Sequence, residues 1–241
     1  MSASPVSCCS VYLEGLVATI SGVRPFGFAT GFLYAGPDAS RWLVTNWHVV
    51  AGRRPDFPGI LLGGKPESPT SLRFAISNPR GGEAQDMEVA LYDEDGPTWI
   101  EGDREAGTDL ALLRLRDPPR FPLPLTQGFA PNGSARLEPG LDVVIVGHPF
   151  EFGLHAAAAV WKGAMVASDL EEVQAGRPWI LLDAPGAPGM SGSPVYRKIP
   201  SDGASGDQGP RLELVAVYAG TVGDENLHAV RLGRAFPIAL V

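Results

Sequence analysis

The sequence has only two cysteines among its 241 residues, and they are neighbours at positions 8 and 9. Adjacent cysteines reach disulfide geometry only with strain, so we expect no structural disulfide. No further cysteine is present to complete a metal site, and metal binding or lipid attachment at Cys8 and Cys9 is a minor alternative. A chain without disulfides is typical of a reducing compartment, which favours the cytoplasm.

Basic residues and long apolar runs are also scarce. The chain has 19 Lys and Arg against 27 Asp and Glu, a net charge of −8, whereas nucleic-acid binding requires clustered basic side chains. No apolar run approaches the ~20 residues needed to span a membrane. The start of the chain shows neither the basic leader nor the apolar core of a signal peptide. We expect no nucleic-acid or membrane partner, and a cytoplasmic protein, or a periplasmic or secreted one if a leader has been removed.

Turn-forming residues, in contrast, are abundant, with 30 Gly and 23 Pro. Short apolar runs between many turns predict an all-β fold. The stretch from 117 to 125 is rich in proline and cannot join a central ladder, so it predicts a boundary between domains 1–117 and 118–241. The predicted strands are 11–20, 26–34, 41–46, 72–77, 87–92, 98–101, 110–115, 142–147, 156–166, 179–183, 193–196, 212–219 and 228–231.

A serine lies between two glycines in the stretch Gly189-Met190-Ser191-Gly192-Ser193-Pro194. Glycine gives the backbone the freedom to form a tight turn on both sides of Ser191. Such a turn directs the N–H groups of Gly189 and Ser191 into one small space, where they stabilise the oxyanion of an acyl-transfer intermediate. An ordinary surface turn is the alternative interpretation of the same residues.

A serine hydroxyl becomes a good nucleophile only when a base removes its proton, and the chain has four histidines. His48 follows an apolar strand and precedes a short turn that ends at Gly52. Asp109 stands at the mouth of the apolar strand 110–115, where a carboxylate is tolerated if it binds an imidazole N–H. We therefore interpret Ser191 as nucleophile, His48 as general base and Asp109 as the acid that orients His48.

These residues resemble the motifs of a known family. Thr45-Asn46-Trp47-His48, Thr108-Asp109-Leu110-Ala111 and the serine stretch resemble the three motifs of trypsin-like serine proteases, in the chymotrypsin-type order His, Asp, Ser. Residues 146–153 and Leu182-Asp183-Ala184 resemble motifs of the HtrA/Deg-type branch. The resemblance implies two six-stranded antiparallel β-barrels with the active site at their interface. It implies a serine endopeptidase that acts on proteins or peptides and needs no metal or other cofactor.

The resemblance also implies where the substrate lies. Trypsin selects basic side chains with an acidic residue six positions before the serine, and here that position is Pro185. By the same comparison, the predicted substrate-binding residues are small or apolar: Pro185, Gly186, Ala187, Tyr218, Ala219 and Gly220. We expect small or medium aliphatic residues before the cut, and an extended peptide paired with the strand edge 218–220.

Regulation differs from that of trypsin-type zymogens. Their activation pairs a freed Ile-Val-Gly-Gly terminus with an Asp directly before the serine, whereas this chain has Met190 there and no such sequence. Control by a regulatory partner protein, or by a C-terminal domain missing from this sequence, is the expectation.

The sequence has other interpretations as well. The chain is alternatively a catalytically silent pair of barrels that binds peptides or proteins. An α/β-hydrolase order of Ser191, Asp224 and His228 fails because its nucleophile elbow requires Gly where this chain has Ser193. His148 and His155 are interpreted as loop histidines rather than a ligand pair, and Asp183 as a structural acid.

Overall fold

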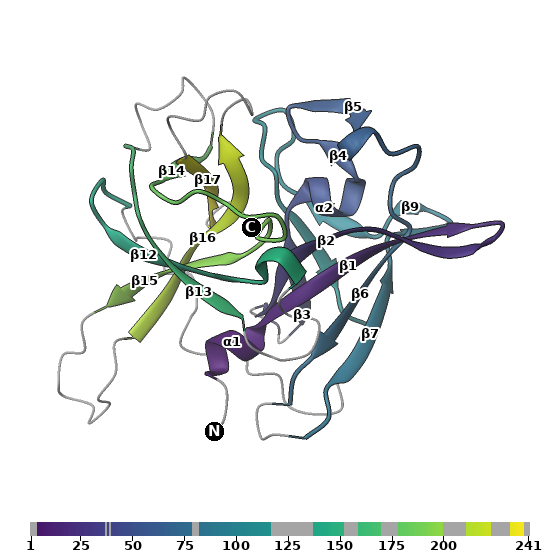
Figure 1. Ribbon diagram of the computed structural model, residues 1–241, viewed down its shortest axis with the longest axis horizontal. Helices are drawn as coiled ribbons and strands as arrows, with labels where there is room; N and C mark the ends of the chain where they lie inside the picture. The colour runs from purple at the N-terminus through teal and green to yellow at the C-terminus, as the bar shows by residue number, and fades with distance from the viewer. Residues whose placement is uncertain are drawn as a thin grey trace.

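Two curled antiparallel sheets form the framework of the protein (Figure 1). The computed structural model describes residues 4–36, 38, 40–78, 82–116, 137–151, 159–169, 178–199, 211–222 and 232–238. The predicted fold class, all-β and chymotrypsin-like, is confirmed. The predicted boundary between residues 117 and 118 lies outside the described residues and stays a prediction.

The N-terminal sheet has seven strands, in the order β10-β11-β3-β2-β1-β6-β7, rather than the predicted six. The additional strand is β10, which pairs with β11 at the edge of the sheet and corresponds to the strand predicted at 98–101. The strands are β1 (Ser10–Thr19), β2 (Gly22–Ala35), β3 (Arg41–Thr45), β6 (Ser71–Ile76), β7 (Gln85–Ala90), β10 (Trp99–Glu101) and β11 (Ala111–Arg114). Two small hairpins lie outside this sheet: β4 (Arg53–Arg54) with β5 (Phe57–Leu61), and β8 (Tyr92–Asp93) with β9 (Gly96–Pro97).

The C-terminal sheet has six strands, as predicted, in the order β13-β12-β15-β16-β17-β14. They are β12 (Asp142–Gly147), β13 (Val160–Met165), β14 (Ile180–Leu182), β15 (Pro194–Ile199), β16 (Arg211–Val222) and β17 (Leu232–Pro237). β17 was not predicted, because Gly, Arg and Pro interrupt its apolar pattern. The strand predicted at 228–231 lies outside the described residues.

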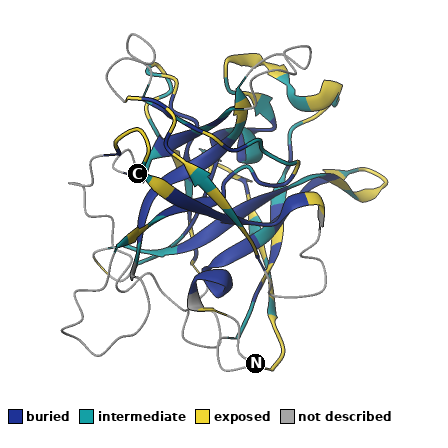
Figure 2. Ribbon diagram, turned by 60° about the vertical axis from the view of Figure 1, so that its left-hand side comes forward, coloured by how far each residue is buried: buried dark blue, intermediate teal, exposed yellow. Residues whose placement is uncertain are grey.

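Alternating side chains give each sheet a buried face. In β6, for example, Leu72, Phe74 and Ile76 are buried while Arg73 and Ala75 are exposed, as expected for a strand with one covered side. Figure 2 shows this contrast along the strands, which are buried where they cross and exposed at the hairpin tips. Each sheet therefore curls around an apolar interior of its own.

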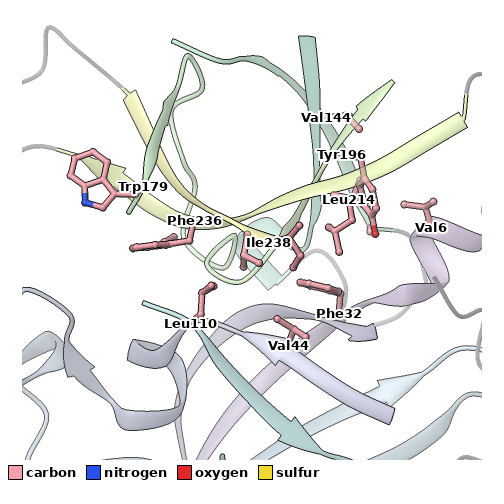
Figure 3. Packing of buried hydrophobic residues seen from close by; sticks show 14 residues of the cluster. Val6, Phe32, Val44, Leu110, Val144, Trp179, Tyr196, Leu214, Phe236 and Ile238 are labelled. Carbon is pink, nitrogen blue, oxygen red and sulfur yellow. The ribbon is translucent and has the colours of Figure 1, made fainter. Parts of the chain in front are cut away.

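A third apolar cluster joins the two sheets (Figure 3). Phe32, Val44 and Leu110 from the N-terminal sheet meet Phe236 and Ile238 from the C-terminal part. Phe32, Val44, Leu110 and Phe236 are fully buried, so the seam between the sheets is a packed core. Asp109, which precedes Leu110 in the chain, is consequently held in a fixed position at this seam.

The helices are short. α1 (Pro5–Cys9) precedes β1 and was not predicted, and α2 (Trp47–Ala51) follows β3. Two 3-10 turns span Leu62–Gly64 and Pro149–Glu151. Within the described ranges, neither helix has the length or the apolar character needed to cross a membrane.

Candidate active site

His48 is carried by the short helix α2 at the end of β3. The helix ends after Ala51 because Gly52 adopts a left-handed φ of 65°. Any side chain at position 52 would be strained there and would meet Pro69 at 2.4 Å. The Gly52 N–H donates to the His48 carbonyl at 3.0 Å, which closes the turn. The His48 side chain is thus anchored at its backbone and remains 14% exposed.

The structure brings Asp109 and His48 together. Asp109 Oδ2 lies 2.7 Å from His48 Nδ1, and Asp109 Oδ1 accepts the His48 backbone N–H at 2.9 Å. The Asp109 side chain is fully buried. The Asn46 side-chain amide donates to the backbone carbonyl of Asp109 at 2.8 Å. Because a carboxylate only accepts hydrogen bonds, Nδ1 carries the imidazole proton and Nε2 keeps its lone pair. This is the tautomer that a general base requires.

Thr30, in β2, anchors the turn that contains Ser191. Its N–H donates to the Ser191 carbonyl at 2.8 Å, and its hydroxyl donates to the Gly189 carbonyl at 2.7 Å. The same hydroxyl accepts the His148 N–H at 2.9 Å, while the Thr30 carbonyl accepts the Thr45 hydroxyl at 2.8 Å. Thr30 is fully buried. One threonine therefore holds two carbonyls of the serine turn against the N-terminal sheet.

The other two carbonyls of the turn are also bonded. The Pro188 carbonyl accepts the Phe150 N–H at 2.9 Å, and the Met190 carbonyl accepts the Ser193 N–H at 3.0 Å. The Met190 N–H in turn donates to the Ala187 carbonyl at 3.1 Å. All four carbonyls from residue 188 to residue 191 are thus engaged.

Two N–H groups of the same turn are left over. Those of Gly189 and Ser191 make no hydrogen bond to any part of the chain that the structure describes. In a trans peptide the C=O and N–H groups point in opposite directions, so the bonded carbonyls of Pro188 and Met190 direct these N–H groups away from their partners. Gly189 has a φ of 92°, which only glycine adopts without strain. The turn is arranged to offer two donors to an anion.

The serine turn packs directly against the strand end that precedes His48. A Cβ on Gly192 would lie 2.0 Å from the Thr30 carbonyl oxygen and 2.3 Å from the Thr45 hydroxyl. A Cβ on Gly220 would lie 3.9 Å from the Ser191 hydroxyl. Between described residues, the structure contains no hydrogen bond from Ser191 to His48. Catalytic hydrogen bonds are often long in unliganded enzymes and shorten when substrate binds.

The predicted substrate-binding residues form two segments beside Ser191. Residues 185–187 follow β14, and residues 218–220 belong to β16. The Gly186 N–H donates to the Thr221 hydroxyl at 3.2 Å, which links the two segments. Residues 219 and 220 pair with neither β15 nor β17, because the register shifts between Tyr218 and Thr221. Their backbone is therefore available to an extended peptide.

The residues of these two segments differ in burial and in their polar contacts. Ala219 is buried in the cluster between the sheets, and Gly220 is the partly exposed residue of this segment. Lys162 donates a hydrogen bond to the Pro185 carbonyl, which places a positive charge at this wall. Tyr218 is only 1% exposed, and burial raises the pKa of its phenol. This lining offers no carboxylate to a basic substrate side chain.

Of the remaining residues that the sequence singled out, His148 contacts the serine turn through its backbone, since its N–H donates to the Thr30 hydroxyl. His148 is buried, and burial lowers the pKa of its imidazole. Asp183 is exposed, and His155, Asp224 and His228 lie outside the described residues. Cys8 and Cys9 are buried thiols that form no disulfide, and burial raises the pKa of the Cys9 thiol to about 12. Nowhere in the described ranges do three His, Cys, Asp or Glu side chains gather as a metal site would require.

Sequence reasoning missed Thr30. The signal was a polar residue in the middle of the apolar run 26–34, where a strand in a two-sided core carries apolar side chains on both faces. A buried hydroxyl in that position requires partners, and the partners turn out to be the serine turn and the residue after β12.

The two curled sheets, with a His–Asp pair and a glycine-flanked serine turn at the seam between them, have the chymotrypsin-type fold. The model of a family described as trypsin-like peptidase domain matches residues 29–198. The chain belongs to this family.

The comparison with solved structures agrees on the fold. The crystal structure of the serine endoprotease from Yersinia pestis matches with a TM-score of 0.55 and 15% sequence identity. The match covers 100% of this chain and 64% of that chain, so the sequence spans about 64% of the length of that protease. No curated protein matches the sequence.

Proposed function

We propose that the protein is a serine endopeptidase in which Ser191, His48 and Asp109 act as the catalytic triad. The observation that carries the proposal is the serine turn. Every carbonyl from residue 188 to residue 191 is bonded, whereas the N–H groups of Gly189 and Ser191 bond to no described residue. A turn built for packing alone has no reason to leave two donors unused. The His48–Asp109 pair at the same seam supports the base that a serine nucleophile needs.

The reaction follows from these groups. Ser191 Oγ attacks the peptide carbonyl carbon while His48 Nε2 takes its proton, and the Gly189 and Ser191 N–H groups stabilise the oxyanion. His48 then donates the proton to the leaving amine as the C–N bond breaks, which leaves an acyl group on Ser191. Water, deprotonated by His48, attacks this ester and releases the carboxylic acid with Ser191 restored. Asp109 holds the imidazole in place and stabilises its charge throughout.

The proposal also covers the substrate preference, the branch of the protease family and the mode of regulation. The small lining, with Lys162 at the Pro185 carbonyl, supports small or medium aliphatic residues before the cut and disfavours Arg and Lys. The motifs at 146–153 and 182–184 support an HtrA/Deg-type enzyme, and the two adjacent cysteines, which form no disulfide, support a cytoplasmic protein. Met190 before the serine supports control by a partner protein or a further domain.

The alternative function is a silent pair of barrels that binds peptides without cleaving them. The observation that favours it is the lack of a hydrogen bond between Ser191 and His48 in the structure as described. Pairing of a peptide with residues 219 and 220 requires no catalytic chemistry, so both functions would use the same strand edge.

A fluorophosphonate probe separates the two functions. The probe bonds to a serine only where a base and an oxyanion site are assembled, so we expect one label per chain, mapped by mass spectrometry to the peptide that contains Ser191. Heat-denatured protein is the control and should remain unlabelled. Folded protein that takes up no label would favour the binding module and contradict the endopeptidase.

Thr30 provides a second test, aimed at the oxyanion turn. Thr30→Val keeps the shape of the side chain but removes the hydroxyl that holds the Gly189 carbonyl. We expect kcat to fall by ~10²–10³, as when one oxyanion donor is lost, with KM changed little. Steady-state kinetics on a peptide substrate measure both constants.

Thr30→Ser is the matched control, since it retains the hydroxyl and should recover most of kcat. Thermal unfolding of both variants distinguishes a displaced turn from a loss of fold. If Thr30→Val retains kcat within about twofold of the parent, the hydroxyl does not position the turn.

A further inference from the structure

Tyr218 occupies the space beneath the two segments that flank Ser191. It lies in β16, directly before the unpaired residues 219 and 220. Its backbone is fixed on both sides, because its N–H donates to the Ser193 carbonyl at 2.8 Å and its carbonyl accepts the Gly192 N–H at 2.8 Å. The ring position is therefore tied to the serine turn itself.

Two glycines receive the ring. A Cβ on Gly186 would lie 2.2 Å from the Tyr218 hydroxyl oxygen, far closer than two such atoms approach. A Cβ on Gly233 would lie 2.4 Å from Tyr218 Cε2 and 3.0 Å from its hydroxyl oxygen. The phenol thus fills the volume between the Gly186 backbone and β17, and no room remains there for another side chain.

The residues that follow in β16, Gly220 and Thr221, lie beside Ser191 and Gly186. The hydrogen bond from Gly186 to Thr221 links the two segments. The Tyr218 hydroxyl is buried and lies close to the backbone of Gly186 and Gly233. The ring therefore acts through its volume, and not through a polar contact with substrate.

We propose that Tyr218 is the specificity-determining residue of this site, and that its ring limits the substrate residue before the cut to the size of Ala or Val. The inference rests on the proposed endopeptidase function and narrows the expected range of small or medium aliphatic residues to its small end. Since one methylene in an apolar pocket changes kcat/KM by ~10–200-fold, larger residues are rejected strongly.

The test is a set of peptides that differ only in having Ala, Val, Leu, Phe or Lys before the cut. For the parent, we expect kcat/KM to be higher for Ala and Val than for Phe by ~10² or more. In Tyr218→Val, the ratio of Phe to Ala should rise by ~10–10², because the ring volume becomes available. Tyr218→Phe keeps the ring and should keep the parent ratio. Tyr34→Val, which removes a tyrosine ring packed against the cluster between the sheets, is the control for a general loss of core volume and should also keep it.

A measurement on the parent alone covers the case in which Tyr218→Val does not fold. Peptide aldehydes that end in Ala or Val should block fluorophosphonate labelling of Ser191 at concentrations ~10²-fold lower than an aldehyde that ends in Phe, because the aldehyde forms a transition-state-like adduct. Equal potency of the Ala and Phe aldehydes would overturn the inference.

The outcomes distinguish the inference from the function on which it rests. Hydrolysis that requires Ser191 but favours Phe or Leu in the parent overturns the role of Tyr218 and leaves the endopeptidase intact. An unchanged Phe-to-Ala ratio in folded Tyr218→Val does the same. Folded protein that neither reacts with the probe nor hydrolyses any of these peptides overturns both.

Discussion

Replacement of Ser191 by Ala is expected to lower kcat for peptide hydrolysis by ~10⁴–10⁶. The change removes the atom that forms the acyl-enzyme, while the four carbonyl groups of the turn keep their partners and the two N–H donors stay in place. The residual rate comes from the oxyanion donors and from binding, which still orient the substrate toward water. KM should change little, because substrate contacts through residues 219 and 220 remain. Single-turnover kinetics with purified variant and parent give both values.

Ser193→Ala is the matched control for this prediction. Its hydroxyl is buried in the same turn and has no hydrogen-bond partner among the described residues. The substitution therefore removes an equivalent group two positions away, and we expect kcat within about tenfold of the parent. Equal rates for Ser191→Ala and the parent would exclude Ser191 as nucleophile.

The local part of the site was within reach of the sequence. Asp109 stands at the mouth of an apolar strand and His48 follows another, and both placements are fixed by short-range patterns of apolar and polar residues. β11 pairs with β3, with Ala111 opposite Thr45, so the two strand ends that carry these residues meet. The sequence predicted this pair because each residue lies next to a strong strand signal.

What the sequence did not predict depends on contacts between distant segments. α1 is a five-residue helix with no capping side chain, and it is held by tertiary contacts such as the hydrogen bond from Trp161 to Ser7. β17 contains Gly233 because Tyr218 needs the space, and that glycine weakens the strand pattern. Thr30 contacts the serine turn from 161 residues away in the chain. Tyr218 was predicted as a substrate-binding residue, but its hydrogen bonds with Gly192 and Ser193 were not. No local pattern encodes such partners, because the packing of the two sheets selects them.

The largest effect expected away from the serine is that of Asp109→Asn, which should lower kcat by ~10⁴. The reason lies in the two bonds that the carboxylate makes. Its Oδ1 accepts the His48 backbone N–H, so the amide oxygen of Asn must take that place and its NH₂ group must face Nδ1. A donor facing Nδ1 forces the imidazole proton onto Nε2, where the lone pair is needed to accept the proton of Ser191. The fold is retained, because both side chains have the same shape.

Two measurements check this account of Asp109. Nitrogen NMR of the imidazole should show the proton on Nδ1 in the parent and on Nε2 in Asp109→Asn, with kcat reduced in parallel. Asp183→Asn changes an exposed carboxylate and should leave both the tautomer and kcat as in the parent. If Asp109→Asn retains more than about a tenth of kcat, the carboxylate does not set the tautomer, and the base must be oriented by other means. If the tautomer changes and kcat does not, proton transfer through His48 is not part of the reaction.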